Sequence, residues 1–242
     1  MKQLDHSSLG YPKSHPDITT PVRKPLSVSP SDDVSLLIET VTGKLVNPTN
    51  PDADTICIDD IAWALSRIPR YVGHTVTEMP YNVAQHSVYV AKIVELIAEG
   101  KLQPDFALDE DSIVYSEGNC LGFYALFHDA HEAYTGDIPS PIKRIPELRE
   151  TIKIIEGKLD HAIRTHFELE EPYEDFVAVI KYADKLAQAV ESYQFMPSRG
   201  LNWNLPKPTL MMLQSFTAPK SPLESYQAFL AEYESLNGLK YK

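Results

Sequence analysis

A short apolar segment, residues 124–132, carries three side chains that could do chemistry. His128 and Asp129 are adjacent, and Glu132 follows about one helical turn later. Burying an ionised carboxylate is costly unless something positive compensates the lost hydration. A divalent cation compensates well, so this segment predicts a bound metal ion.

Two further residues of the same chemical character lie in other apolar, helix-like segments. His86 shares a helical face with Val90 and Ile97, so its imidazole should point inward, and Asp184 follows Ile180 by one turn. The alternatives are a core histidine bonded to the backbone and a solvated aspartate. Mixed imidazole and carboxylate ligands suit Co, Mn, Zn, Fe or Ni and leave coordination positions for water and a phosphate oxygen.

The order of these residues, a histidine, a His-Asp pair and then an aspartate on three expected helices, resembles the HD-domain metal-dependent phosphohydrolases. Residues 128–139 read His-Asp-Ala-His-Glu-Ala-Tyr-Thr-Gly-Asp-Ile-Pro. This run looks like the signature of the small nucleotidase branch, the bacterial 5'-deoxynucleotidases and related phage dATP triphosphohydrolases. The similarity runs from about residue 34 to 195. It implies one divalent transition metal per chain, held by His86, His128, Asp129 and Asp184.

Two-metal members of the wider family use additional histidines. Here His161 and His166 could serve only if their helix turned them inward, so a single ion is expected. His131 is out of phase with His128 on a continuous helix and is therefore expected at the surface.

Two more carboxylates are candidates for proton transfer. Glu132 lies four residues after His128, on the same helical face, where it could accept a proton from the attacking water. Asp137, after Gly136, matches the other catalytic carboxylate of the family. An exposed helix residue and a helix N-cap are the alternatives for Glu132 and Asp137, and the sequence does not say which is the acid and which the base.

Phosphate needs cations besides the metal, and Arg70 is the strongest choice. It precedes Tyr71, where the nucleotidases typically place a tryptophan, so the tyrosine leaves base and sugar selection open. Arg144 is at least as well explained as a solvated basic residue. The candidates for contacts to the substrate are Arg70, Tyr71, His74, Lys143 and Lys185.

Helical periodicity dominates the elements that must position these residues. The sequence predicts an all-α fold, an HD-domain helical bundle with a small N-terminal β-hairpin at residues 35–46. The expected helices are 58–66, 83–98, 121–134, 146–167, 173–195 and 223–235.

Three regions are expected along the chain. Residues 1–33 are proline-rich and polar and should form a flexible arm, because they bury too little surface to offset the cost of ordering. Residues 34–195 should form the HD phosphohydrolase domain, with an acidic loop over 101–118. Residues 196–242 should be a C-terminal extension packed on the same domain.

Composition restricts the partners. With 242 residues, 43% of them hydrophobic, and a net charge of -12, the chain suits a small-molecule nucleotide and neither a nucleic-acid polymer nor an anionic membrane. Cys57 and Cys120 are expected to be buried thiols, and a cytoplasmic location, in a bacterial cell or a phage-infected host, is expected. The resemblance implies a homo-oligomer.

The predicted function is divalent-metal-dependent hydrolysis of a deoxynucleotide phosphate ester. The enzyme could be a deoxynucleoside 5'-monophosphate phosphatase or a dNTP triphosphohydrolase acting, for example, on dATP. A non-catalytic nucleotide sensor with the HD fold and a two-iron oxygenase are the alternatives. The sequence has no Gly-rich phosphate loop, Ser-His-Asp elbow or zincin motif.

Overall fold

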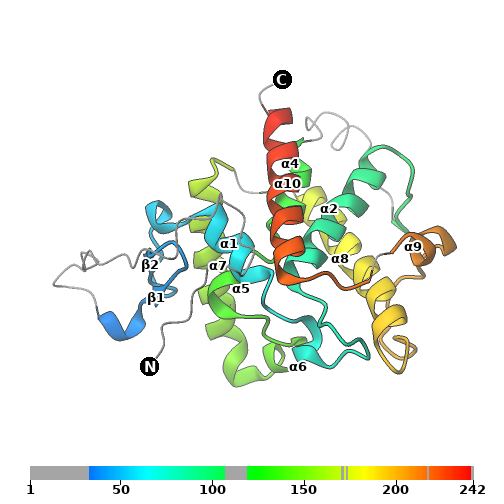
Figure 1. Ribbon diagram of the computed structural model, residues 1–242, viewed down its shortest axis with the longest axis horizontal. Helices are drawn as coiled ribbons and strands as arrows, with labels where there is room; N and C mark the ends of the chain where they lie inside the picture. Colours follow the sequence, from blue (N-terminus) through cyan, green and yellow to red (C-terminus); the bar gives the residue numbers. More distant parts are fainter. Residues whose placement is uncertain (1–32, 107–118, 170–171, 173, 217, 241–242) are drawn as a thin grey trace, which may run out of the picture.

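A computed structural model describes residues 33–106, 119–169, 172, 174–216 and 218–240. The expected arm before residue 33 and most of the expected loop over 101–118 lie outside the described residues, and the three-region division stays a prediction. Within the described ranges the chain is mostly helical and has one small sheet, which confirms the predicted all-α class (Figure 1).

The expected hairpin is present and short. Strand β1 (Ile38–Glu39) pairs in antiparallel fashion with β2 (Leu45–Val46). Gly43 has a φ of 81°, a conformation in the turn that glycine adopts without strain. Among the described residues, short 3-10 helices cover Val34–Leu36, Ala53–Thr55 and Arg70–Gly73.

The helices follow the apolar periodicity closely at most positions. They are α1 (Ile58–Leu65), α2 (Val83–Ala98), α4 (Asn119–Leu126), α5 (Glu132–Thr135), α6 (Ser140–Lys143), α7 (Pro146–His166), α8 (Glu174–Phe195), α9 (Leu210–Ser215) and α10 (Pro222–Lys240). The short helices α6 and α9 were not expected from the sequence, and α10 is longer at both ends than predicted. None of the described helices combines the length and the hydropathy that crossing a membrane requires.

Helix α2 is the central element. Asn82 caps it by accepting a hydrogen bond from the backbone N–H of Gln85 at 3.0 Å, and α2 packs against α4, α8 and α10. Because neighbours surround α2, the polar side chains of Gln85 and His86 are buried along with its apolar residues. The site is built around this helix.

The predicted helix over residues 121–134 is wrong in one respect, because it is broken in the middle. Helix α4 ends at Leu126 and α5 begins at Glu132. Between them the backbone makes tighter turns, in which Ala130 N–H donates to Phe127 and Glu132 N–H donates to Asp129, at 2.9 and 3.0 Å. No glycine or proline marks this break, and the apolar pattern continues across it.

The cysteine prediction is only partly testable. Cys57 lies just before α1 and is a free thiol. It is half-buried, whereas full burial was expected. The side chain of Cys120 lies outside the described residues.

Candidate metal centre and active site

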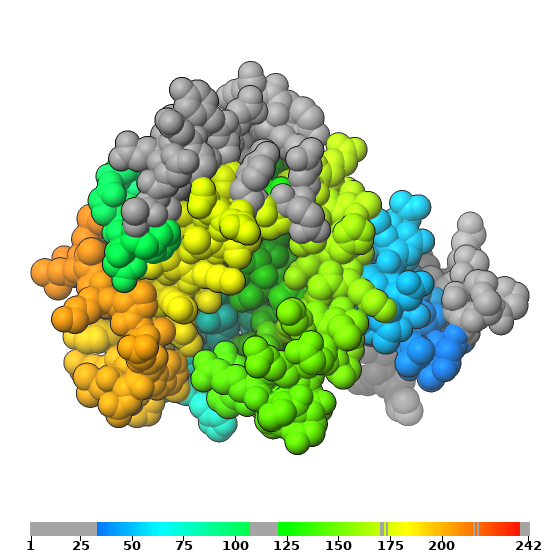
Figure 2. Space-filling model, turned by 180° about the vertical axis from the view of Figure 1, so that it is seen from behind, coloured from blue at the N-terminus to red at the C-terminus, as the bar shows by residue number. Residues whose placement is uncertain are grey.

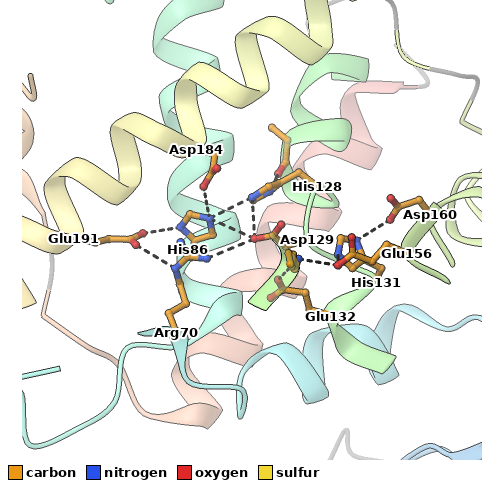
Figure 3. A network of polar contacts seen from close by, with 12 residues as sticks. Arg70, His86, His128, Asp129, His131, Glu132, Glu156, Asp160, Asp184 and Glu191 are labelled. Atoms are coloured by element: carbon orange, nitrogen blue, oxygen red, sulfur yellow. Dashed lines mark hydrogen bonds and ion pairs between the residues drawn. The ribbon is translucent and has the colours of Figure 1, made fainter. Parts of the chain in front are cut away.

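The four predicted metal ligands converge from α2, the turn after α4, and α8 (Figure 3). His86 Nε2 lies 3.2 Å from His128 Nε2 and 3.2 Å from Asp184 Oδ1. Asp129 Oδ2 lies 3.1 Å from His128 Nε2 and 3.6 Å from His86 Nε2. Candidate ligand atoms of His86, His128 and Asp184 all lie within 4.8 Å of one another.

Hydrogen bonds to the other ring nitrogens fix how the two imidazoles present themselves. His86 Nδ1 lies 2.6 Å from Glu191 Oε1, and His128 Nδ1 lies 2.8 Å from the carbonyl oxygen of Ala125. Both partners accept, so each Nδ1 donates, and in the neutral rings each Nε2 carries a lone pair directed into the site. This is the arrangement in which histidines bind metal ions.

The cluster therefore brings electron-rich atoms together that repel each other unless a positive charge joins them. One source of charge is a proton on His86. Burial and Arg70 oppose that proton, but the carboxylates of Glu191 and Asp184 outweigh them and raise the pKa of His86 to about 9. The other source is a divalent cation, for which two imidazoles and two carboxylates are a suitable donor set.

The two aspartates stay ionised in this setting. Burial tends to raise the pKa of both, but His128 and His86 hold the pKa of Asp129 well below its usual range, and the hydrogen bond to His86 lowers the pKa of Asp184. Asp129 is largely covered, whereas the side chain of Asp184 is 39% exposed. The cluster is thus closed on the Asp129 side and more open at Asp184.

The break in the helix explains how adjacent residues reach one point. On a regular α-helix, His128 and Asp129 would diverge by about 100° around the axis. The turn between α4 and α5 replaces that geometry, and both side chains face His86. The four predicted ligands converge, and the continuous helix expected between Leu121 and Tyr134 is replaced by this turn.

Glu132 and Asp137 lie beside the four candidate metal ligands. Glu132 is 3% exposed, and its Oε2 has no hydrogen-bond partner among the described residues. Burial, with the charges of Asp129 and Asp137, raises the pKa of Glu132 to about 9. Burial also raises the pKa of Asp137, against the opposing effect of Arg70. Neither carboxylate has the environment of a fully solvated surface group.

Arg70 and Tyr71 also reach the centre. Arg70 is buried, with Nε 3.2 Å from Glu191 Oε2 and Nη1 3.6 Å from Asp129 Oδ2. The Tyr71 hydroxyl donates to Glu191 Oε2 at 2.7 Å. Tyr71 and Val72 both have left-handed backbone angles, φ 57° and 55°, which are strained for residues other than glycine.

Of the other three predicted contacts to the substrate, one lies near the centre and two are exposed. Lys143 Nζ is 2.7 Å from Glu156 Oε1 and 4.0 Å from Glu132 Oε1, so it stands close to the catalytic candidates. His74 and Lys185 are exposed, and no described contact joins either of them to the cluster. Lys181, one turn before Lys185, lines the neighbouring cavity.

Two residues of the site were missed or misplaced by sequence reasoning. Glu191 received no role, although it lies seven residues after Asp184 on α8, a spacing of two turns that puts both on one face. His131 was expected at the surface but is buried, with Nδ1 2.9 Å from Asp160 Oδ1 and Nε2 3.6 Å from Glu156 Oε1. The broken helix changes its phase, which is why that expectation fails. His161 and His166 are exposed and lie away from the cluster.

A cavity of about 340 Å³ adjoins the candidate metal ligands, between α7 and α8. Figure 2 shows this face hollowed between the yellow-green atoms of α7 and the yellow atoms of α8. His128 and Asp184 form part of its wall, and most of the remaining lining is apolar or aromatic. These other lining residues are Tyr124, Phe127, Asp160, Ile163, Arg164, Leu169, Pro172, Val177, Ile180 and Lys181.

Comparison with known proteins points to one family. The uncharacterized protein YfdR of Escherichia coli K12 is 30% identical over 203 residues, which cover 84% of this chain and 97% of YfdR. The 5'-deoxynucleotidase VP0926 of Vibrio parahaemolyticus is 30% identical over 105 residues, 40% of this chain and 46% of that protein. Among solved structures, the cyanophage S-2L HD phosphohydrolase DatZ, bound to dA and one catalytic Zn²⁺ ion, is 19% identical with a TM-score of 0.43. That alignment covers 75% of this chain and 96% of DatZ.

The family described as 5'-deoxynucleotidase YfbR-like matches residues 61–198, which include all four predicted metal ligands and both catalytic candidates. The resemblance found in the sequence is thereby confirmed. The chain belongs to the YfbR-like 5'-deoxynucleotidase family.

Proposed function

We propose that the protein removes the phosphate group from deoxynucleoside 5'-monophosphates, with one divalent transition-metal ion per chain. Family membership gives metal-dependent hydrolysis of a deoxynucleotide, and the proposal adds the monophosphate as substrate. The monophosphate follows from the 5'-deoxynucleotidase activity in the names of the family and of the relative VP0926. The metal-dependent step rests on one observation, the convergence of His86 Nε2 and His128 Nε2, 3.2 Å apart, beside the carboxylates of Asp129 and Asp184. These four side chains would hold the ion.

The metal is one of Co, Mn, Zn, Fe or Ni, since the donor set contains imidazole and carboxylate and no thiolate. When bound, such an ion polarises a phosphate oxygen and lowers the pKa of water. A single ion is favoured because His161 and His166 are exposed and lie outside the cluster. A single metal ion per chain argues against the two-iron oxygenase alternative.

Glu132 and Asp137 would divide the proton transfers between them. With its pKa raised to about 9, Glu132 holds a proton at neutral pH and suits the role of acid toward the leaving 5'-oxygen. Asp137 is less deeply buried and suits the role of base toward water. The presence of both carboxylates at the centre favours an enzyme over a non-catalytic sensor.

Arg70 and Lys143 would bind the phosphate group. Arg70 holds its guanidinium beside Asp129, and a guanidinium has more N–H donors than the ion pairs with Glu191 and Asp129 use. Lys143 supplies a second cation 4.0 Å from Glu132. Tyr71, His74 and Lys185 stay proposed contacts to the rest of the nucleotide, with His74 and Lys185 requiring movement of exposed side chains.

The deoxynucleoside would occupy the cavity beside His128 and Asp184. Its volume of about 340 Å³ lies at the lower end of the range typical for small-molecule sites. Aromatic and aliphatic side chains such as Tyr124, Phe127 and Ile180 offer the apolar contacts that a base and sugar need.

The test is a product assay on purified protein supplied with Co²⁺, Mn²⁺ or Zn²⁺ and a panel of deoxynucleoside mono- and triphosphates. Release of inorganic phosphate from the monophosphates, with no turnover by Asp129→Ala, is the expected result. Release of tripolyphosphate from a triphosphate such as dATP would assign the alternative reaction. Absence of turnover on every nucleotide would contradict the proposal and favour the sensor.

A further inference from the structure

Glu191 is a fully buried carboxylate on α8 that contacts both the metal side and the substrate side of the centre (Figure 3). Its Oε1 accepts from His86 Nδ1 at 2.6 Å. Its Oε2 accepts from the Tyr71 hydroxyl at 2.7 Å and from Arg70 Nε at 3.2 Å. One side chain thus joins a predicted metal ligand to the two residues that begin the strained turn.

A carboxylate suits this position because all three neighbours donate. Burial alone would raise the pKa of Glu191, but His86 and Arg70 outweigh it and lower the pKa to about 2. A buried anion with several charge-assisted donors fixes the directions of all of them, since any rotation breaks a strong hydrogen bond. The imidazole of His86 is therefore held with Nε2 toward His128 and Asp184.

The same contacts hold the backbone that presents Arg70. Tyr71 and Val72 follow it with φ values of 57° and 55°, which persist only when surrounding contacts enforce them. The hydrogen bond from the Tyr71 hydroxyl to Glu191 is one such contact, and packing of Tyr71 on Trp203, with ring centroids 5.8 Å apart, is another.

We propose that Glu191 is a positioning residue that couples metal binding to phosphate binding by orienting His86 with one oxygen and the Arg70–Tyr71 turn with the other. The phosphate half of this inference rests on the proposed function, whereas the metal half does not. Glu191 contacts no reacting atom, and it acts through its three neighbours.

The metal half is tested by direct Co²⁺ titration of the full chain, following the visible absorption of the bound ion. Outer-shell partners of metal-binding histidines contribute about 10- to 100-fold to affinity, so Glu191→Gln should weaken Co²⁺ binding by that factor. The matched control is Asp60→Asn, which alters a buried carboxylate bonded to Thr42 and should leave Co²⁺ affinity at the wild-type value.

The phosphate half is tested with Tyr71→Phe, which removes one hydroxyl and leaves the bond between His86 and Glu191. Calorimetry with inorganic phosphate on the Co²⁺-loaded protein should give a dissociation constant about two- to tenfold higher than wild type. Its Co²⁺ affinity should stay within about threefold of wild type. Circular dichroism would show whether each variant folds. If Glu191→Gln does not fold, Glu191→Asp, which keeps the charge and withdraws the carboxylate from His86, replaces it in the Co²⁺ titration.

Wild-type Co²⁺ affinity in a folded Glu191→Gln protein would overturn the inference, as would wild-type phosphate affinity in Tyr71→Phe. Neither readout needs turnover. If both variants behave as expected and no deoxynucleotide is hydrolysed, the proposed function fails while the positioning role of Glu191 stands.

Discussion

Protonation of His86 decides when the centre can take up a metal ion. With a pKa of about 9, this imidazole is protonated at neutral pH in the metal-free protein, whereas a metal ligand must be neutral. Glu191 and Asp184 cause the high pKa, and in the proposed centre they also orient the ring and complete the ligand set. The carboxylates that favour the proton therefore favour a divalent cation as well.

Metal binding is accordingly expected to release about one proton at pH 7. Because the pKa of His86 is raised, the competing proton is present below about pH 9, so metal affinity should rise about tenfold per pH unit as the pH increases toward that value. Calorimetric titration with Mn²⁺ in two buffers of different ionisation enthalpy measures the proton count. The exposed His161→Ala variant should give the same count as wild type, and zero release would show that His86 is neutral beforehand.

Glu132 offers a test of the proton-transfer step itself. Replacing it with glutamine keeps the shape and removes the acid, so kcat should fall about 10²- to 10⁴-fold. Glu132 lies outside the four-ligand set, so bound metal, measured by elemental analysis, should be unchanged. A variant that retains wild-type kcat would assign the transferred proton to another group.

Most of the helices could be predicted because long amphipathic segments carry a strong periodic signal. Helices α2 and α7 begin as predicted, after the cap at Asn82 and at Pro146. The break between Leu126 and Glu132 could not be predicted, since its cause is not a local glycine or proline. The paired side chains of His128 and Asp129 reach one point only with that break in place.

The sequence points to a candidate site residue when a polar side chain stands in an apolar segment. It does not do so when the residue is buried only by the packing of another helix. His86, His128, Asp129 and Asp184 belong to the first kind. Glu191 is one acid among several on a charged helix, and it becomes a buried partner of His86 only because α8 packs on α2. His131 is similar, since its contact with Asp160 depends on the approach of α7.

Gly136 controls how the chain leaves α5 for Asp137. Its φ of 74° and ψ of 164° fall in a region that is essentially restricted to glycine. An added Cβ meets no atom within 4 Å, so the effect of Gly136→Ala comes from the backbone. The variant should lose about 1–3 kcal/mol of unfolding free energy and lower kcat by moving Asp137, while metal affinity stays unchanged.

Gly157 gives the matched control for that substitution. It lies within α7, has no unusual φ, and its added Cβ also meets nothing within 4 Å. Gly157→Ala should therefore stabilise the protein by up to about 1 kcal/mol and leave kcat unchanged. Urea unfolding and steady-state kinetics on both variants make the comparison, and equal behaviour of the two would refute a special conformation at Gly136.

The whole molecule has a net charge of -12, although the substrate of its family is an anionic nucleotide. The centre itself contains the ionised carboxylates of Asp129, Asp184 and Glu191, which the cations of Arg70 and protonated His86 only partly offset, since Lys143 is paired with Glu156. A bound divalent cation would correct this imbalance where the phosphate arrives. A small-molecule nucleotide fits this distribution, while a homo-oligomer and a cytoplasmic location stay predictions.

The C-terminal helix connects the scaffold of the site with the rest of the chain. Helix α10 packs against α1, α2 and α4, with Phe229 fully buried and the Tyr226 hydroxyl donating to Asp59 at 2.7 Å. It therefore backs α2 and α4, the helices that carry His86 and lead into His128. Changes in α10 should reach the centre through these two helices without touching a ligand.

Phe229→Ala should lower the unfolding free energy by about 3–5 kcal/mol, because it leaves a cavity where three helices meet α10. The exposed Glu234→Ala on the same helix should change it by less than about 0.5 kcal/mol. Urea unfolding measures both. A loss of stability in Phe229→Ala without a change in Co²⁺ affinity would mean that α2 and α4 hold the ligands unaided. A loss of both would mean that the metal centre depends on the packing of α10.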